Sequence, residues 1–93
     1  MITVIVYQIK SDRVRTVLRK ILLSYGNPVQ NSVFECRLNT SQFKELIKNI
    51  ERIKEQLSTA DSIRVYTVCK NCIANTIIIG SKPIVTDPIC YIV

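Results

Sequence analysis

The residues best suited to chemistry lie at one joint of the chain, where an apolar segment ends at Gln8 and Ile9 and a basic run begins. A joint between a strand and a helix gathers free backbone N–H groups and a positive potential, so it commonly holds a phosphate or a metal-bound substrate. Cations along the basic run could bind successive phosphates of a nucleic-acid backbone without reading its sequence. These cations are Arg13, Arg15, Arg19 and Lys20. The alternative is that they form an ordinary solvated helix face.

The charge balance of the whole chain favours a polyanionic partner. Lys and Arg outnumber Asp and Glu by 13 to 7 in 93 residues, a net charge of +6, and nucleic acid is the first candidate. The sequence contains no histidine, which excludes histidine bases, histidine-activated nucleophiles and histidine metal ligands. Catalysis would have to use carboxylates, thiols or lysine. The carboxylates Asp12, Glu35 and Asp61 do not form an obvious acid–base pair by their spacing.

The cysteines bear on compartment and metal binding. The first residues, MITVIVYQIK, are too short an apolar run to span a bilayer and lack the features of a signal peptide, so we expect a cytoplasmic protein with reduced thiols and no membrane partner. Cys69 and Cys72 have the spacing of half a zinc site, but the other ligands would be the distant Cys36 and Cys90. The sequence predicts a turn here, whereas a thioredoxin-type motif would need a helix directly after a strand. Whether Cys69 and Cys72 bind a metal stays open.

The joint belongs to a strand followed by a helix. Residues 2–9 are apolar on both alternating sets, which predicts a central strand covered on both faces. Ser11 is a suitable helix cap with Asp12 in the first turn, and apolar residues then recur at helical spacing up to Gly26, a natural stop. The basic run therefore lies at the start of an amphipathic helix.

The rest of the chain continues the alternation. After a turn at Gly-Asn-Pro, residues 29–38 are predicted to form a strand, and residues 39–42 form a capping box that opens a second helix. Two further strands are predicted over 61–68 and 75–81, and two prolines keep the tail, residues 83–93, extended.

We expect one ferredoxin-like α+β domain over residues 1–93, with the order β-α-β-β-α-β, both helices on one face of the sheet, and a C-terminal extra strand, although the predicted segments place only one strand between the helices. The strands supply apolar residues to both faces, and a large exposed apolar face is rare in a soluble monomer. We therefore expect a homodimer packed sheet to sheet. Residues 83–93 could add a strand to the neighbouring subunit or pair within their own chain.

Several segments resemble the family of CRISPR-associated protein two, the small adaptation subunit of prokaryotic immunity. They are VIVYQI, YGNPVQNSVFECRL and IRVYTVC, together with Asp87 and Pro88, and the most specific motif runs from Tyr25 to Glu35. The resemblance extends nearly end to end. It implies a ferredoxin-like homodimer with exchanged C-terminal strands. It also implies spacer acquisition, in which this dimer joins two dimers of the CRISPR-associated integrase and holds a short double-stranded DNA.

The resemblance also implies roles for single residues. Arg15 and Arg13 match arginines that contact the DNA backbone. Many members are described as magnesium-dependent endonucleases on RNA or DNA, with an aspartate as metal ligand at the position of Gln8. An amide oxygen carries no net charge, so a dimer would lack about two negative charges that a hard dication prefers.

We therefore expect a DNA-binding scaffold with weak or no nuclease activity. One alternative is a magnesium-dependent endonuclease that recruits other carboxylates, such as Asp12. The other is a toxin-like ribonuclease on the same fold.

Overall fold

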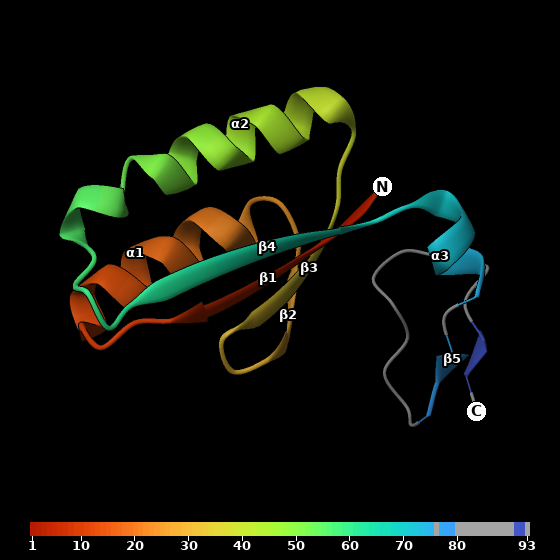
Figure 1. Cartoon of the computed structure of the whole chain (residues 1–93), viewed down its shortest axis with the longest axis horizontal. Coiled ribbons are helices and arrows are strands. Elements are labelled where there is room, and N and C mark those ends of the chain that lie inside the picture. The colour runs from red at the N-terminus through yellow and green to blue at the C-terminus, as the bar shows by residue number, and fades with distance from the viewer. Residues whose placement is uncertain (76, 80–90, 93) are drawn as a thin grey trace.

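A four-stranded antiparallel sheet with two helices on one face makes up most of the chain (Figure 1). The computed structural model describes residues 1–75, 77–79 and 91–92. The strands lie in the order β2-β3-β1-β4, which confirms the predicted ferredoxin-like arrangement. Along the chain its elements are β1 (Ile2–Gln8), α1 (Asp12–Leu23), β2 (Asn27–Gln30), β3 (Val33–Arg37), α2 (Thr40–Glu51) and β4 (Ser62–Val68).

Strand β1 is central, as its composition predicts. Ile5 lies opposite Phe34 of β3 on one side and Val65 of β4 on the other. Ile5 and Phe34 are fully buried against the helices, and burial of each such side chain contributes about 1.5–3 kcal/mol. Val4 and Val6 alternate with Ile5 and are only partly buried. That a partner covers this second face of the sheet therefore stays a prediction.

Helix α1 begins where the sequence predicts and ends slightly earlier. The Ser11 hydroxyl accepts a hydrogen bond from the Val14 N–H at 3.3 Å, and the last helical residue is Leu23. Gly26 does more than stop this helix. A Cβ atom on Gly26 would lie 2.3 Å from the Glu35 carbonyl oxygen and 2.6 Å from Cys36 Sγ, so glycine is needed for the chain to pass this close to β3.

Gly26→Ala is therefore expected to destabilise the fold by about 1–3 kcal/mol, because the obstructing atoms belong to the β3 backbone and to the fully buried Cys36. Urea unfolding followed by circular dichroism measures the loss. Ser24→Ala is the matched control in the same turn, since Ser24 is exposed and most such substitutions change stability by less than about 0.5 kcal/mol. Wild-type stability in Gly26→Ala would contradict the close approach.

The single strand predicted over 29–38 is wrong. The structure has a hairpin there, with β2 and β3 joined by a turn at Asn31 and Ser32. Ser32 has a φ of 69°, in the left-handed region that reverses the chain. The Gly-Asn-Pro turn was also misplaced, because Pro28 lies in β2 opposite Phe34. A proline is tolerated there because β2 is an edge strand.

Helix α2 opens with the predicted capping box. The Asn39 side chain accepts from the Gln42 N–H at 2.8 Å, and the Gln42 side chain accepts from the Asn39 N–H at 2.9 Å. The helix ends at Glu51, and a 3-10 turn, η1, follows at Lys54–Gln56. Within the described parts of the chain, no helix combines the length and apolar character that crossing a bilayer requires.

The segment after β4 also differs from expectation. The predicted turn around Cys69 is wrong, because helix α3 (Lys70–Ala74) begins there. The strand predicted over 75–81 is seen as β5 (Ile77–Ile78), which pairs in parallel with β6 (Tyr91–Ile92) in a separate two-stranded sheet. Most of the predicted tail, including residues 83–90, lies outside the described residues.

Candidate nucleic-acid site

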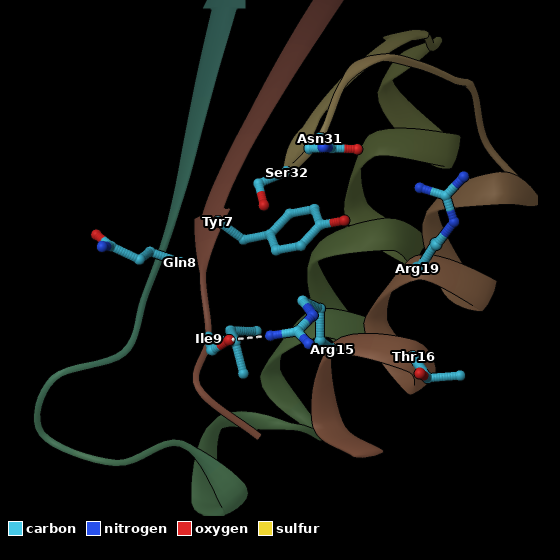
Figure 2. A pocket seen from close by; sticks show the side chains of 8 residues that line it. All are labelled: Tyr7, Gln8, Ile9, Arg15, Thr16, Arg19, Asn31 and Ser32. Atoms are coloured by element: carbon cyan, nitrogen blue, oxygen red, sulfur yellow. Dashed lines mark hydrogen bonds between the residues drawn. The ribbon is translucent and has the colours of Figure 1, made fainter. Parts of the chain in front are cut away.

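An open pocket of about 400 Å³ lies between the end of β1, the first turns of α1 and the β2–β3 turn (Figure 2). Its lining includes the guanidinium groups of Arg15 and Arg19, the ring of Tyr7 and the polar turn residues Asn31 and Ser32. The Tyr7 N–H donates to the Ser32 carbonyl oxygen at 3.0 Å, which ties the turn to β1. The pocket therefore combines two cations with neutral polar groups.

Arg15 joins β1 to α1. Its Nη1 donates to the Ile9 carbonyl oxygen at 2.7 Å, as Figure 2 shows, and its Nη2 forms an ion pair with the Asp12 carboxylate. The side chain is 40% exposed, so its remaining N–H groups can reach a ligand. Because Asp12 offsets part of its charge, the main role of Arg15 is to hold the end of β1 against the start of α1.

Arg19 lies one turn further along α1 and is exposed. Its Cζ atom is 5.6 Å from the centroid of the buried Phe34 ring, a cation–π contact worth about 0.5–1 kcal/mol. No carboxylate of the described residues forms an ion pair with Arg19. Its charge is thus held at the pocket and remains available to an anion.

The other two predicted cations are not in the pocket. Arg13 and Lys20 are exposed residues of α1, but neither belongs to the pocket lining. The structure therefore brings together Arg15 and Arg19, while Arg13 and Lys20 could only extend a basic surface around the helix.

Gln8 is separated from the basic pocket. It borders the pocket through its position in β1, but its side chain points away from Tyr7 and Arg15 (Figure 2). Successive strand residues face opposite sides of a sheet, so Gln8 shares the helix-free face with Val4 and Val6. The structure therefore divides the joint seen in the sequence into two sites. One is a basic pocket on the helix side, and the other is the Gln8 amide on the helix-free face.

The carboxylates near the joint already have partners. The Asp61 carboxylate accepts from the backbone N–H groups of Ser58 and Lys10, at 2.9 and 3.0 Å. These bonds lower the pKa of Asp61, with the Ser58 bond the larger cause. The Asp12 carboxylate pairs with Arg15, and Ser11 provides the helix cap.

A magnesium ion, which the resemblance implies for many members, is usually held by one or two carboxylates together with waters and substrate phosphates. Gln8 offers a neutral amide, and Asp12 and Asp61 are engaged as described. Among the residues that the structure describes, no three acidic, cysteine or histidine side chains gather where they could hold a metal ion. The residues around Gln8 in one chain therefore do not fit a magnesium site.

Sequence reasoning missed Tyr7, Asn31 and Ser32 as pocket residues. Strand alternation could have placed Tyr7 on the helix side of the sheet, since it faces the same side as Ile5. The prediction of a single strand over residues 29–38 concealed the turn that contains Asn31 and Ser32. An Asn-Ser pair between two apolar runs is a turn signal that could have revealed them.

Comparison with known proteins relates the chain to one family. The profile of the family "CRISPR associated protein Cas2" matches residues 1–76. A curated relative named CRISPR-associated endoribonuclease Cas2 3, from Synechocystis sp., is 39% identical over 85 residues, which cover 91% of this chain and 90% of the relative. A relative of the same name from Chloroflexus aurantiacus is 39% identical over 93 residues, covering 100% and 98%.

Solved structures agree. Cas2 of Streptococcus pyogenes superposes with a TM-score of 0.64 at 30% identity, over 76% of this chain and 89% of that one. A hypothetical protein from Thermus thermophilus gives a TM-score of 0.61 at 35% identity, over 73% and 80%.

Proposed function

The chain belongs to the CRISPR-associated protein Cas2 family, and on this premise we propose that it is a cytoplasmic spacer-acquisition protein. In this role a homodimer joins dimers of the CRISPR-associated integrase and holds the double-stranded DNA of the new spacer. The protein acts as a DNA-binding scaffold and not as the enzyme that makes the insertion.

The composition of the pocket carries this proposal. Its described lining contains two guanidinium groups and neutral polar side chains, without a carboxylate. Such a set suits the phosphates of a nucleic-acid backbone, which guanidinium, hydroxyl and amide groups bind without reading sequence. Arg13 and Lys20 extend the basic surface along α1, and the net charge of +6 favours the same partner.

The proposed dimer uses the helix-free face of the sheet. Val4, Val6 and Val33 on this face are partly buried, and Tyr66 of β4 is 50% exposed. These apolar side chains are suited to a self-complementary two-fold contact. In this proposal residues 1–93 form one domain, and residues 83–93 contribute a strand to the dimer.

A second candidate function is a magnesium-dependent endonuclease. The observation in its favour is that curated relatives from Synechocystis sp. and Chloroflexus aurantiacus are named endoribonucleases. Gln8 and the engaged carboxylates Asp12 and Asp61 argue against it in this chain.

Arg19→Ala is expected to weaken binding of a short DNA duplex by a similar factor on unrelated sequences. Each lost phosphate contact should flatten the plot of log affinity against log salt by about 0.9. Fluorescence anisotropy over a salt series measures both. Arg15 is less suitable for this test because its loss also breaks the bond to Ile9.

Lys44→Ala is the matched control, since it removes one positive charge from an exposed position on α2. An equal change of slope in both variants would assign the effect to net charge and not to the pocket. Reconstitution of the wild-type protein with the integrase and the same duplex tests the scaffold role itself. Failure of that ternary complex to form would contradict the proposed function.

A further inference from the structure

The thiols of Cys69 and Cys72 meet at the start of α3. Cys69 lies between the last residue of β4 and the first residue of α3, and Cys72 is in the first turn of this helix. The Cys69 thiol donates to Cys72 Sγ at a separation of 3.2 Å, and both residues are exposed. A helix that begins directly after a strand, with two thiols three residues apart, is the arrangement of a redox-active pair.

We propose that Cys69 and Cys72 are a dithiol that is reversibly oxidised to an intramolecular disulfide by a low-molecular-weight disulfide such as glutathione disulfide. One thiolate attacks a glutathione sulfur, forms a mixed disulfide and releases one glutathione thiolate. The second cysteine then loses its proton and attacks the Sγ atom of the first cysteine, which releases the second glutathione. Two protein thiols are oxidised, one glutathione disulfide is reduced, and the two protons end on the two glutathione molecules.

The protonation order supports a stepwise exchange. The hydrogen bond with Cys69, followed by the negative charge of the Cys69 thiolate, raises the pKa of Cys72. Loss of a second proton from the pair is therefore disfavoured while the first thiolate is present, so the exchange proceeds one thiol at a time. A thiolate is the species that attacks, so the first thiol to ionise forms the mixed disulfide.

Cys36 provides a contrast within the same chain. It is fully buried in β3, and burial raises its pKa to about 11. A protonated thiol that solvent does not reach is inert toward a soluble disulfide. The oxidation is therefore confined to the pair at the start of α3.

The disulfide would close a small ring where the chain leaves the four-stranded sheet. Beyond α3 the chain continues to β5, which lies away from the helices α1 and α2 (Figure 1). A bond between Cys69 and Cys72 would fix the first turn of α3 to the end of β4. This inference does not depend on DNA binding or on the integrase.

Trypsin gives a direct test because Lys70 lies between the two cysteines. Full-length protein with Cys90→Ser is incubated with glutathione disulfide, alkylated, and digested under denaturing, non-reducing conditions. Cleavage after Lys70 separates the two thiols, so a disulfide must join peptide 65–70 to peptide 71–93. The expected product is this joined pair, lighter than the two peptides by two hydrogen atoms and separated again by a reductant.

The Cys90→Ser background is needed because Cys90 lies in the same tryptic peptide as Cys72. A non-reducing gel must show a monomer, since a disulfide between two chains would join the same peptides. Cys72→Ser in this background is the matched control, and it should hold one glutathione on Cys69 that is not released without reductant. Alkylated or singly modified peptides without a joined pair, or a joined pair only in covalent dimers, would overturn the proposal.

Discussion

Val6→Lys should convert the proposed homodimer into a folded monomer. Val6 lies on the helix-free face of the central strand, directly opposite Val33 of β3 and Arg64 of β4, while Glu35 lies on the same face opposite Val4. In a two-fold dimer the substitution would place two added lysines inside the contact, each opposite Arg64 of its own chain. A buried unpaired charge costs about 3–5 kcal/mol, so association should weaken on the order of a thousandfold or more.

Light scattering at micromolar concentration measures the oligomeric state, and circular dichroism shows whether the fold is kept. Val17→Lys is the matched control, because it makes the same change at a position on α1 that is 40% exposed and remote from the helix-free face. It should leave the dimer intact. A monomeric wild-type protein, or a Val6→Lys variant that remains a dimer, would contradict the proposed interface.

The wild-type protein is expected to show no appreciable magnesium-dependent cleavage of RNA or duplex DNA, whereas Gln8→Asp should gain it. Mg²⁺ requires anionic oxygen ligands to compete with its own hydration shell, and Gln8 supplies only a neutral amide. Gln8→Asp would add one carboxylate per chain on the helix-free face. Because a bound metal contributes several kcal/mol to catalysis, the gain should be on the order of a hundredfold.

Cleavage of labelled RNA and duplex DNA, with Mg²⁺ and with a chelator, measures this activity. Gln8→Asn is the control, since it has the size of aspartate without its charge and should remain inactive. The prediction fails if the wild-type protein cuts with Mg²⁺, loses that activity with a chelator and loses it again on Asp12→Asn. That outcome would favour the endonuclease function over the scaffold.

Three tests address different parts of the proposal. Loss of the dimer in Val6→Lys concerns the sheet face, and the cleavage assay concerns Gln8 on the same face, while Arg19 lies on the helix side. If one of these predictions fails while the others hold, the failed prediction identifies which part of the proposal is wrong.

The local features of the fold could be predicted from the sequence, because they depend on neighbouring residues. Ser11 caps α1, and Asn39 and Gln42 form the capping box of α2, since side chains three residues apart reach the same backbone N–H groups. The apolar residues of β1 placed this strand at the centre of the sheet. The family and the ferredoxin-like arrangement followed from the same segments.

The tertiary structure decided what depends on residues distant in the sequence. Gly26 is required by the approach of β3, and the hairpin at Asn31 and Ser32 brings polar groups to the end of β1. Neither the approach of β3 nor the position of the hairpin can be predicted from the spacing of neighbouring residues. The helix at α3 likewise places the Cys69 and Cys72 thiols together, where the sequence predicted only a turn.

The candidate site shows the same division. The sequence supplied Gln8 and the cations of α1, but it treated them as one joint. Strand alternation places the Gln8 side chain on the helix-free face, while the packing of α1 brings Arg15 and Arg19 to the opposite side. Residue identity determined the chemistry that is available, and the packing of α1 against the sheet determined which of those groups can act on the same ligand.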